Sequence, residues 1–207
     1  IETDPEESLD EDPEKIAQAA SLTDTSQTEY SAAIRYINEK SKLWNLHTDI
    51  GIKFRFPADP FTRFRASRTK QSTHWLTRFT ETLFWFNSIG LGETSRLDFE
   101  RPLSETYFLR LTTKATWLHD EQAFDLSQSI STFHKINDDL GIAYRARVFG
   151  NTQPNSHVTG YLINMQLRKR IYEKWLFFQV TPQAFFPEDE DFKLSPSLTF
   201  TLEANLE

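Results

Sequence analysis

Basic side chains recur at every second position in several stretches of this sequence, which is the spacing that gathers them on one face of a strand. The stretch "YRARVFG" places Arg145 and Arg147 two residues apart, and "LRKRIY" does the same for Arg168 and Arg170. Guanidinium and ammonium groups collected in a cleft attract anions such as a small solute or a phosphate group. The predicted basic inner face consists of Lys53, Arg55, Arg63, Arg65, Arg78, Arg96, Arg110, Lys114, Arg145, Arg147, Arg168 and Arg170.

The same strand faces carry fewer acids than bases. The basic residues can therefore be interpreted in two ways. One is a structural ladder of ion pairs and hydrogen bonds, because polar groups in a narrow interior must find partners. The other is a surplus of positive potential that draws in an anion, a lipid phosphate or the chain's own acidic N-terminal arm. The predicted acidic partners are Asp49, Asp98, Glu100, Asp125 and Glu203.

Catalytic and metal-binding patterns are weak. His119-Asp120 could form half of an acid–base dyad, but no serine or second acid stands at a telling spacing, so a polar loop is the better interpretation. Asp138-Asp139 and "EDED" at 188–191 lack the alternating ligands of a calcium loop. There is no cysteine, no histidine pair at helical spacing and no glycine-rich phosphate loop. We expect no catalytic residue, no metal, no cofactor and no nucleic-acid partner.

These side chains must be positioned by strands, because from Trp44 onward the apolar residues recur with a period of two. The stretch "YFLRLTTKATWL" carries apolar residues on one face and Arg110, Thr112, Lys114 and Thr116 on the other. We predict ten strands, with eight as the alternative, and an even number is the rule for bacterial outer-membrane barrels. The predicted strands are 44–56, 60–68, 73–87, 93–101, 106–118, 122–134, 139–149, 157–172, 174–186 and 193–206.

The connections alternate between short and long. "KQS", "PLSE", "INDD" and "YEK" are short, whereas "NSIGLGE", "GNTQPNSH" and "FPEDEDFK" are longer and rich in turn residues. Only "PADP" and "HDEQ" are short where the alternation requires a long loop. Outer-membrane barrels have short periplasmic turns and longer extracellular loops. The pattern therefore favours an up-and-down barrel whose short turns face the periplasm.

Strand length and terminal aromatics distinguish a membrane barrel from a soluble barrel of lipocalin type. Tyr107 and Trp117 are ten residues apart on one face, and so are Trp75 and Trp85. Ten residues of a tilted strand climb about 25 Å, the height of the apolar band between two aromatic girdles. We therefore predict that the apolar faces contact outer-membrane lipid. The predicted interface aromatics are Trp44, Trp75, Trp85, Tyr107, Trp117 and Trp175.

Two polar residues interrupt the apolar faces. Glu81 shares the face of Trp75 and Trp85, and we expect a β-bulge after Phe79 to turn it inward. Gln128 similarly falls on the apolar face of its strand.

The N-terminal part differs in composition from the rest. Residues 1–14 hold eight acids and no base, so we expect 1–27 to be a disordered acidic arm. Tyr30, Ala33, Ile34 and Ile37 recur at helical spacing, which predicts a short amphipathic periplasmic helix over 28–42. The barrel then occupies 43–207.

From about residue 44 onward, the stretches "GETSRLDFERPL", "TTKATW", "QSIS", "VFGNTQP", "IYEKWLFFQVTPQAFFPEDE" and "SPSLTFTLE" carry a resemblance. They resemble a group of uncharacterised outer-membrane β-barrel proteins of Gram-negative bacteria. The resemblance implies the fold and the location, and it carries over no catalytic residue.

Three classes of function stay open. The first is a structural or interaction role, in which the N-terminal segment or the loops contact a larger outer-membrane or periplasmic assembly. The alternative is a narrow anion-permissive channel with an arginine-lined lumen. The third, a loop-borne outer-membrane enzyme, has the least support.

Overall fold

The computed structural model describes residues 30–38, 44–54, 56–172 and 175–204. These residues form an eleven-stranded sheet in which every strand pairs antiparallel with its neighbours in the chain. One short 3-10 helix, η1 (Glu188–Glu190), precedes the last strand. The strands are β1 (Tyr30–Asn38), β2 (Asn45–Phe54), β3 (Asp59–Gln71), β4 (Leu76–Phe86), β5 (Gly90–Pro102), β6 (Tyr107–Leu118), β7 (Ala123–Lys135), β8 (Leu140–Asn151), β9 (His157–Tyr172), β10 (Leu176–Pro187) and β11 (Ser195–Ala204).

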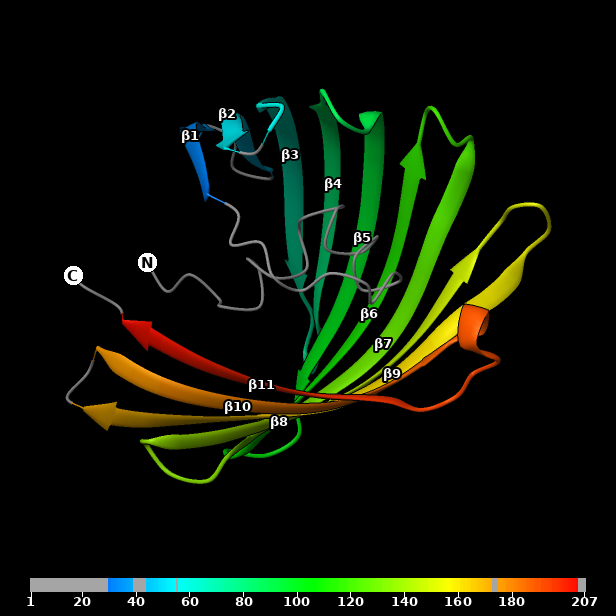
Figure 1. Cartoon of the computed structure of the whole chain (residues 1–207). Helices are drawn as coiled ribbons and strands as arrows, with labels where there is room; N and C mark the ends of the chain where they lie inside the picture. The colour runs from blue at the N-terminus through cyan, green and yellow to red at the C-terminus, as the bar shows by residue number, and fades with distance from the viewer. Residues whose placement is uncertain (1–29, 39–43, 55, 173–174, 205–207) are drawn as a thin grey trace.

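The sheet is strongly curved, and its two edges are β1 and β11 (Figure 1). Within the described residues these two edge strands do not pair with each other. The all-β, up-and-down architecture predicted from the sequence is confirmed, and β2 to β11 correspond to the ten predicted strands. No helix in the described ranges is long and apolar enough to cross a membrane.

The predicted helix over 28–42 is wrong for the part that the structure describes, 30–38. Tyr30–Asn38 instead forms β1, which pairs with β2 from Tyr30 opposite Phe54 to Asn38 opposite Leu46. The segment "YSAAIRYIN" contains two isoleucines and two tyrosines, types that favour strands, and β2 offers it an edge with unpaired backbone groups. Tertiary pairing therefore overrides the local helical spacing. The acidic arm over 1–27 lies outside the described residues.

The turns at the two ends of the sheet differ. The end formed by the turns 72–75, 103–106 and 136–139 is called the short-turn end here, and the opposite end, which carries 152–156 and 188–194, is the long-loop end. One predicted long loop, "NSIGLGE", is shorter than expected because β5 already begins at Gly90, which has a positive φ of 77°. Only residues 87–89 separate β4 from β5.

Adjacent residues on the strands show which face meets solvent or lipid. On β2, Ile50 and Phe54 are 64% and 59% exposed, whereas Asp49 and Lys53 are 3% and 6% exposed. A soluble barrel would bury the apolar set and expose the charged one. An apolar exterior around a polar interior is the arrangement of a transmembrane barrel, as the sequence predicted.

An aromatic cluster also lies in the interior, near the long-loop end. Phe61 of β3 stacks on Phe86 of β4 with ring centroids 5.2 Å apart, and Phe84 meets Phe86 edge-on. All three rings are buried, with Ile89 and Leu118 packed against them. This cluster fills space beside the charged residues of the inner face.

Candidate functional site

The candidate site is the inner face of the sheet. Arg55 lies outside the described residues. The other predicted bases alternate with exposed outward residues along their strands, and so lie on the inner face. The predicted acids lie there as well, and Asp49, Asp98 and Glu100 are buried. The structure therefore brings the predicted bases and acids onto one surface, but it distributes them unevenly around it.

The first part of this surface, called the ion-paired wall, is the inner face of β2 to β6. Arg110 Nε donates to Glu100 Oε1 at 2.9 Å, and both side chains are less than a tenth exposed. Two more pairs have the same 2.9 Å separation, namely Arg63 with Asp49 and Arg96 with Asp98. Each of these acids lies within reach of a base on the same strand or the next one, so these pairs match the structural ladder.

Hydroxyl groups complete the ion-paired wall. The Thr112 hydroxyl donates to Asp98 Oδ1 at 2.6 Å, and the hydroxyls of Thr94 and Thr116 lie 3.0 Å apart. These threonines were not among the predicted site residues. They occupy the same strand face as Arg110 and Lys114, so parity alone could have identified them.

A buried acid was also missed. Asp59, only 1% exposed, begins β3 opposite Lys53 of β2. Its carboxylate accepts hydrogen bonds from the Ser88 backbone nitrogen at 2.9 Å and from the Ser88 hydroxyl at 2.8 Å. The sequence "PADP" resembled a plain turn, and Asp59 fastens the loop after β4 to this turn.

The second part, called the arginine face, consists of Ser129, Ser131, Arg145, Arg147 and Asn164. Arg145 lies opposite Ser131 of β7 and Asn164 of β9, and its Nε donates to the Ser131 hydroxyl at 3.3 Å. Arg147 lies opposite Ser129 on β7, and its guanidinium is 5.6 Å from the Phe149 ring. The cross-strand neighbours of these two arginines are neutral, whereas Arg63 and Arg110 of the ion-paired wall lie opposite Asp49 and Glu100.

The two predicted arginines of β9 lie between this face and the short-turn end. Arg168 Nη2 donates to Glu203 Oε1 at 3.0 Å, and its guanidinium stacks over Phe177 at 4.3 Å. Arg170 donates to the Asp138 carbonyl at 2.8 Å and lies 3.5 Å from Asp139. Asp125, the fifth predicted acid, accepts a hydrogen bond from the Asn151 side-chain amide at 2.8 Å.

The predicted interface aromatics lie at both ends of the outer face. Trp44, Trp75, Tyr107 and Trp175 are at the short-turn end, whereas Trp85 and Trp117 are at the long-loop end. Arg101 lies over the Trp75 ring at 5.5 Å, and Tyr107 stacks on His134 with centroids 4.2 Å apart. Amphipathic rings at both borders of an apolar surface are the arrangement found in membrane barrels.

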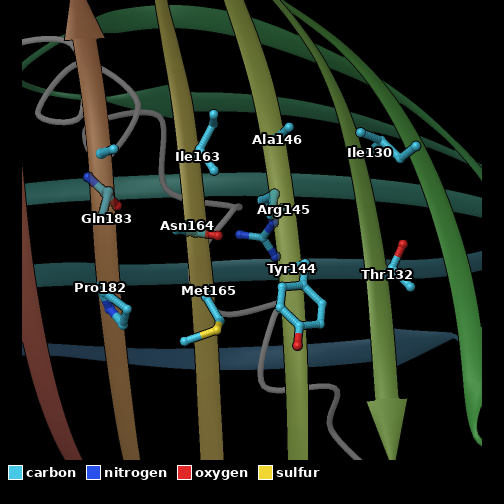
Figure 2. Close-up of a pocket in the computed structure, with 11 residues that line it drawn as sticks. Ile130, Thr132, Tyr144, Arg145, Ala146, Ile163, Asn164, Met165, Pro182 and Gln183 are labelled. Carbon is cyan, nitrogen blue, oxygen red and sulfur yellow. The ribbon is translucent and has the colours of Figure 1, made fainter. Parts of the chain in front are cut away.

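A groove of about 520 Å³ opens on the outer wall, across β7 to β10 (Figure 2). It forms where the small Ala146 lies among Tyr144, Ile163, Met165 and Pro182. Arg145, Asn164 and Gln183 also border the groove, but its exposed lining is mostly apolar, which suits a lipid chain better than a polar solute. Within the described ranges, no three acidic or histidine side chains converge as a metal site would require.

Comparison with solved structures identifies the fold. The NanC porin aligns with a TM-score of 0.57 and 8% identity over 86% of this chain and 94% of its own. The KdgM porin gives 0.54 and 10% over 86% and 97%, and the outer membrane channel DcaP of Acinetobacter baumannii gives 0.50 and 8% over 83% and 61%. No protein-family profile and no characterised protein matches the sequence.

At such low identity these likenesses establish the fold, which is that of an outer-membrane β-barrel. The sequence resemblance stated above is therefore supported at the level of the fold only. Together with the apolar, aromatic-bordered exterior, the fold places the chain in the bacterial outer membrane, as predicted.

Proposed function

We propose that this protein is a narrow outer-membrane channel that favours anions. The observation that carries the proposal is the arginine face, where Arg145 and Arg147 lie among hydroxyl and amide groups on the inner surface. The likeness to the NanC and KdgM porins and to the DcaP channel supports a transport role over a purely structural one.

The geometry gives a physical route for an anion. Arg145 and Arg147 are two residues apart on β8, so their positions are separated by about 6.6 Å along the strand. An anion can pass from one guanidinium to the next while Ser129, Ser131 and Asn164 supply hydrogen-bonding groups in place of lost water. Several sites of moderate strength allow an ion to enter and also to leave.

The ion-paired wall does not provide a comparable route for an anion. Arg63, Arg96 and Arg110 are each held by an acid at 2.9 Å, so the charge of these three bases is largely compensated within the wall. A role as an interaction protein, acting through the N-terminal segment or the loops, stays a prediction, since the acidic arm lies outside the described residues. A loop-borne enzymatic role likewise stays a prediction. Its candidate residue, His119, packs against Trp117 with the ring centroids 5.6 Å apart.

The test is the zero-current potential of the full-length protein in a planar lipid bilayer under a potassium chloride gradient. We expect a potential that indicates preference for chloride. The double variant Arg145→Gln/Arg147→Gln should reduce that preference about tenfold, because each removed charge acts on an ion within a few ångströms.

The matched control is Arg96→Gln/Asp98→Asn, which removes one base and one acid from the ion-paired wall and leaves the net charge unchanged. It should keep the selectivity of the wild type. A protein that conducts no ions, that prefers cations, or that responds equally to both double variants would contradict the proposal.

A further inference from the structure

A proline interrupts the hydrogen-bond ladder between β9 and β10. The described pairs of these strands skip Thr181 and Pro182, although the pairs directly on either side keep one register, which places Met165 opposite Pro182. Proline has no hydrogen on its nitrogen to donate, and within a sheet it is normally confined to edge strands and bulges. The pairing of β10 with β11 continues through Pro182, so the missing bond lies on the β9 side. This weakened point of the wall is called the proline seam here.

The outer groove lies across the proline seam. Its lining residues form three rows that cross the strands at successive levels (Figure 2). The first and third rows point outward and are mostly apolar. The middle row belongs to the inner face and consists of Arg145, Asn164 and Gln183, which lie opposite one another on β8, β9 and β10. These three residues are called the polar row here.

Little more than the sheet backbone separates the polar row from the groove. Ala146 and Ala184 lie opposite Ile163 from its two sides, and their short side chains leave the backbone beneath them uncovered. The groove therefore combines an apolar trough of about 520 Å³ with one guanidinium and two side-chain amides. Ligand sites have this composition and size, since they are mostly apolar and contain a few placed polar groups.

We propose that this part of the wall binds a long-chain carboxylate. Its hydrocarbon chain lies in the outer groove, and its carboxylate reaches Arg145 at the proline seam, where β9 and β10 separate most easily. Charge complementarity selects the head, because a guanidinium holds a carboxylate through two parallel, charge-assisted hydrogen bonds. The apolar trough selects the chain, because its burial against Ile163 and Met165 removes apolar surface from the head's polar surroundings.

The position of the arginine on its strand favours a single-chain occupant over a phospholipid. Arg145 lies near the middle of β8, five residues after Leu140 and six before Asn151. Phospholipid headgroups stay at the borders of the hydrocarbon core, about 15 Å from its centre. A contact at the middle of the strand therefore requires a small charged head on one chain. The site goes beyond the proposed channel, because binding of this ligand needs no conducting lumen.

Binding of palmitate to the full-length protein in phospholipid nanodiscs tests the proposal, with the isotope-labelled carboxyl group followed by NMR. We expect saturable binding that Arg145→Gln weakens about tenfold, as the loss of a charge-assisted pair implies. The matched control Arg147→Gln removes the same charge two residues along β8, outside the groove lining, and should keep the affinity. Hexadecanol, which has the same chain and no charge, should compete about tenfold less well than unlabelled palmitate.

Three results of this titration would overturn the proposal. Without saturable binding, the bilayer phospholipid is the better occupant of the groove. Equal losses in Arg145→Gln and Arg147→Gln would mean that the charge of the whole interior attracts palmitate. Equal competition by hexadecanol would mean that the groove accepts any apolar chain and that the polar row makes no contact with the head.

A second pair of variants tests the place of the chain. Ala146→Trp fills the trough and should weaken palmitate binding more than tenfold, whereas Val148→Trp, the next outward residue of β8 and outside the lining, should not. Heat-modifiable gel migration verifies that each variant is folded. Binding that survives Ala146→Trp would show that the chain lies elsewhere and would contradict the proposal. Because the measurement is binding and not ion selectivity, this site and the channel can fail separately.

Discussion

The ion-paired wall and the arginine face line the same interior, but the residues beside their basic side chains differ in charge. Arg110 on β6 is locked to Glu100 and is almost completely buried, whereas Arg145 on β8 lies between a serine and an asparagine. The difference arises from what the neighbouring strands carry at the paired positions. β5 supplies Asp98 and Glu100, and β7 supplies serines at the equivalent level.

The comparison shows that a base on the inner face of a barrel has no fixed role. Where the cross-strand partner is an acid, the base forms an ion pair within the wall and contributes to the stability of the fold. Where the cross-strand residue carries a hydroxyl, the paired strand supplies no opposite charge, and we propose that the guanidinium acts on a mobile ion. Predictions about the two walls should therefore differ in kind: variants of the first should change stability, and variants of the second should change ion selectivity.

The largest expected effect is on the ion-paired wall. Arg110→Leu leaves the buried Glu100 carboxylate without its partner and should lower the free energy of unfolding by about 3–5 kcal/mol. Urea unfolding in lipid vesicles, followed by tryptophan fluorescence, measures the loss. The double variant Arg110→Leu/Glu100→Leu removes both charges and should recover most of it. An equally severe loss in the double variant would mean that packing, rather than charge pairing, sets the cost.

Substitution of two glycines, Gly92 on β5 and Gly141 on β8, compares how densely these two strands are packed. At Gly92 on β5 an added Cβ would overlap the Phe84 ring and lie 2.9 Å from the Trp117 carbonyl, whereas at Gly141 on β8 the nearest atom is 3.8 Å away. Gly92→Ala should therefore destabilise by about 1–3 kcal/mol. Gly141→Ala should be close to neutral in the same urea experiment. Similar losses at both positions would show that β5 and β8 are packed equally densely at these two glycines.

The smallest effect concerns pH at the short-turn end, in the turn after β7. The Lys135 ammonium, 2.6 Å from Asp138, holds the pKa of that carboxyl below its ordinary value of 3.8, and Arg170 contributes more weakly. Because the folded pKa is depressed, the pairing stabilises the turn above the ordinary value and is lost as pH falls through the lowered one. In an NMR titration, Lys135→Met should raise the Asp138 pKa, and the distant Lys193→Met should not. A pKa that Lys135→Met leaves unchanged would contradict this assignment.

The strand faces could be predicted from the sequence because alternation has a direct geometric meaning. Once Ile50 and Phe54 are placed outward, Asp49 and Lys53 must point inward, and the structure agrees. The aromatic spacing fixed the height of the apolar band for the same reason. Local pattern failed at Tyr30–Asn38, where pairing with β2 decides the conformation.

Partners across the sheet could not be read from single strands. That Arg145 meets Ser131 and Arg110 meets Glu100 depends on the register between neighbouring strands, which turn lengths and bulges set. Glu81 shows the same limit, because one acid in an apolar stripe suggests a bulge and only the register excludes one. The uneven division of charge between the two walls thus became visible only in the folded chain.

The central claim is that the arginine face sets the selectivity of the channel, and charge reversal tests it most directly. The zero-current potential of Arg145→Glu/Arg147→Glu should change sign relative to the wild type under the same salt gradient, which indicates a preference for cations. A potential that keeps its sign and size, in a barrel that is still heat-modifiable and conducting, would contradict the claim.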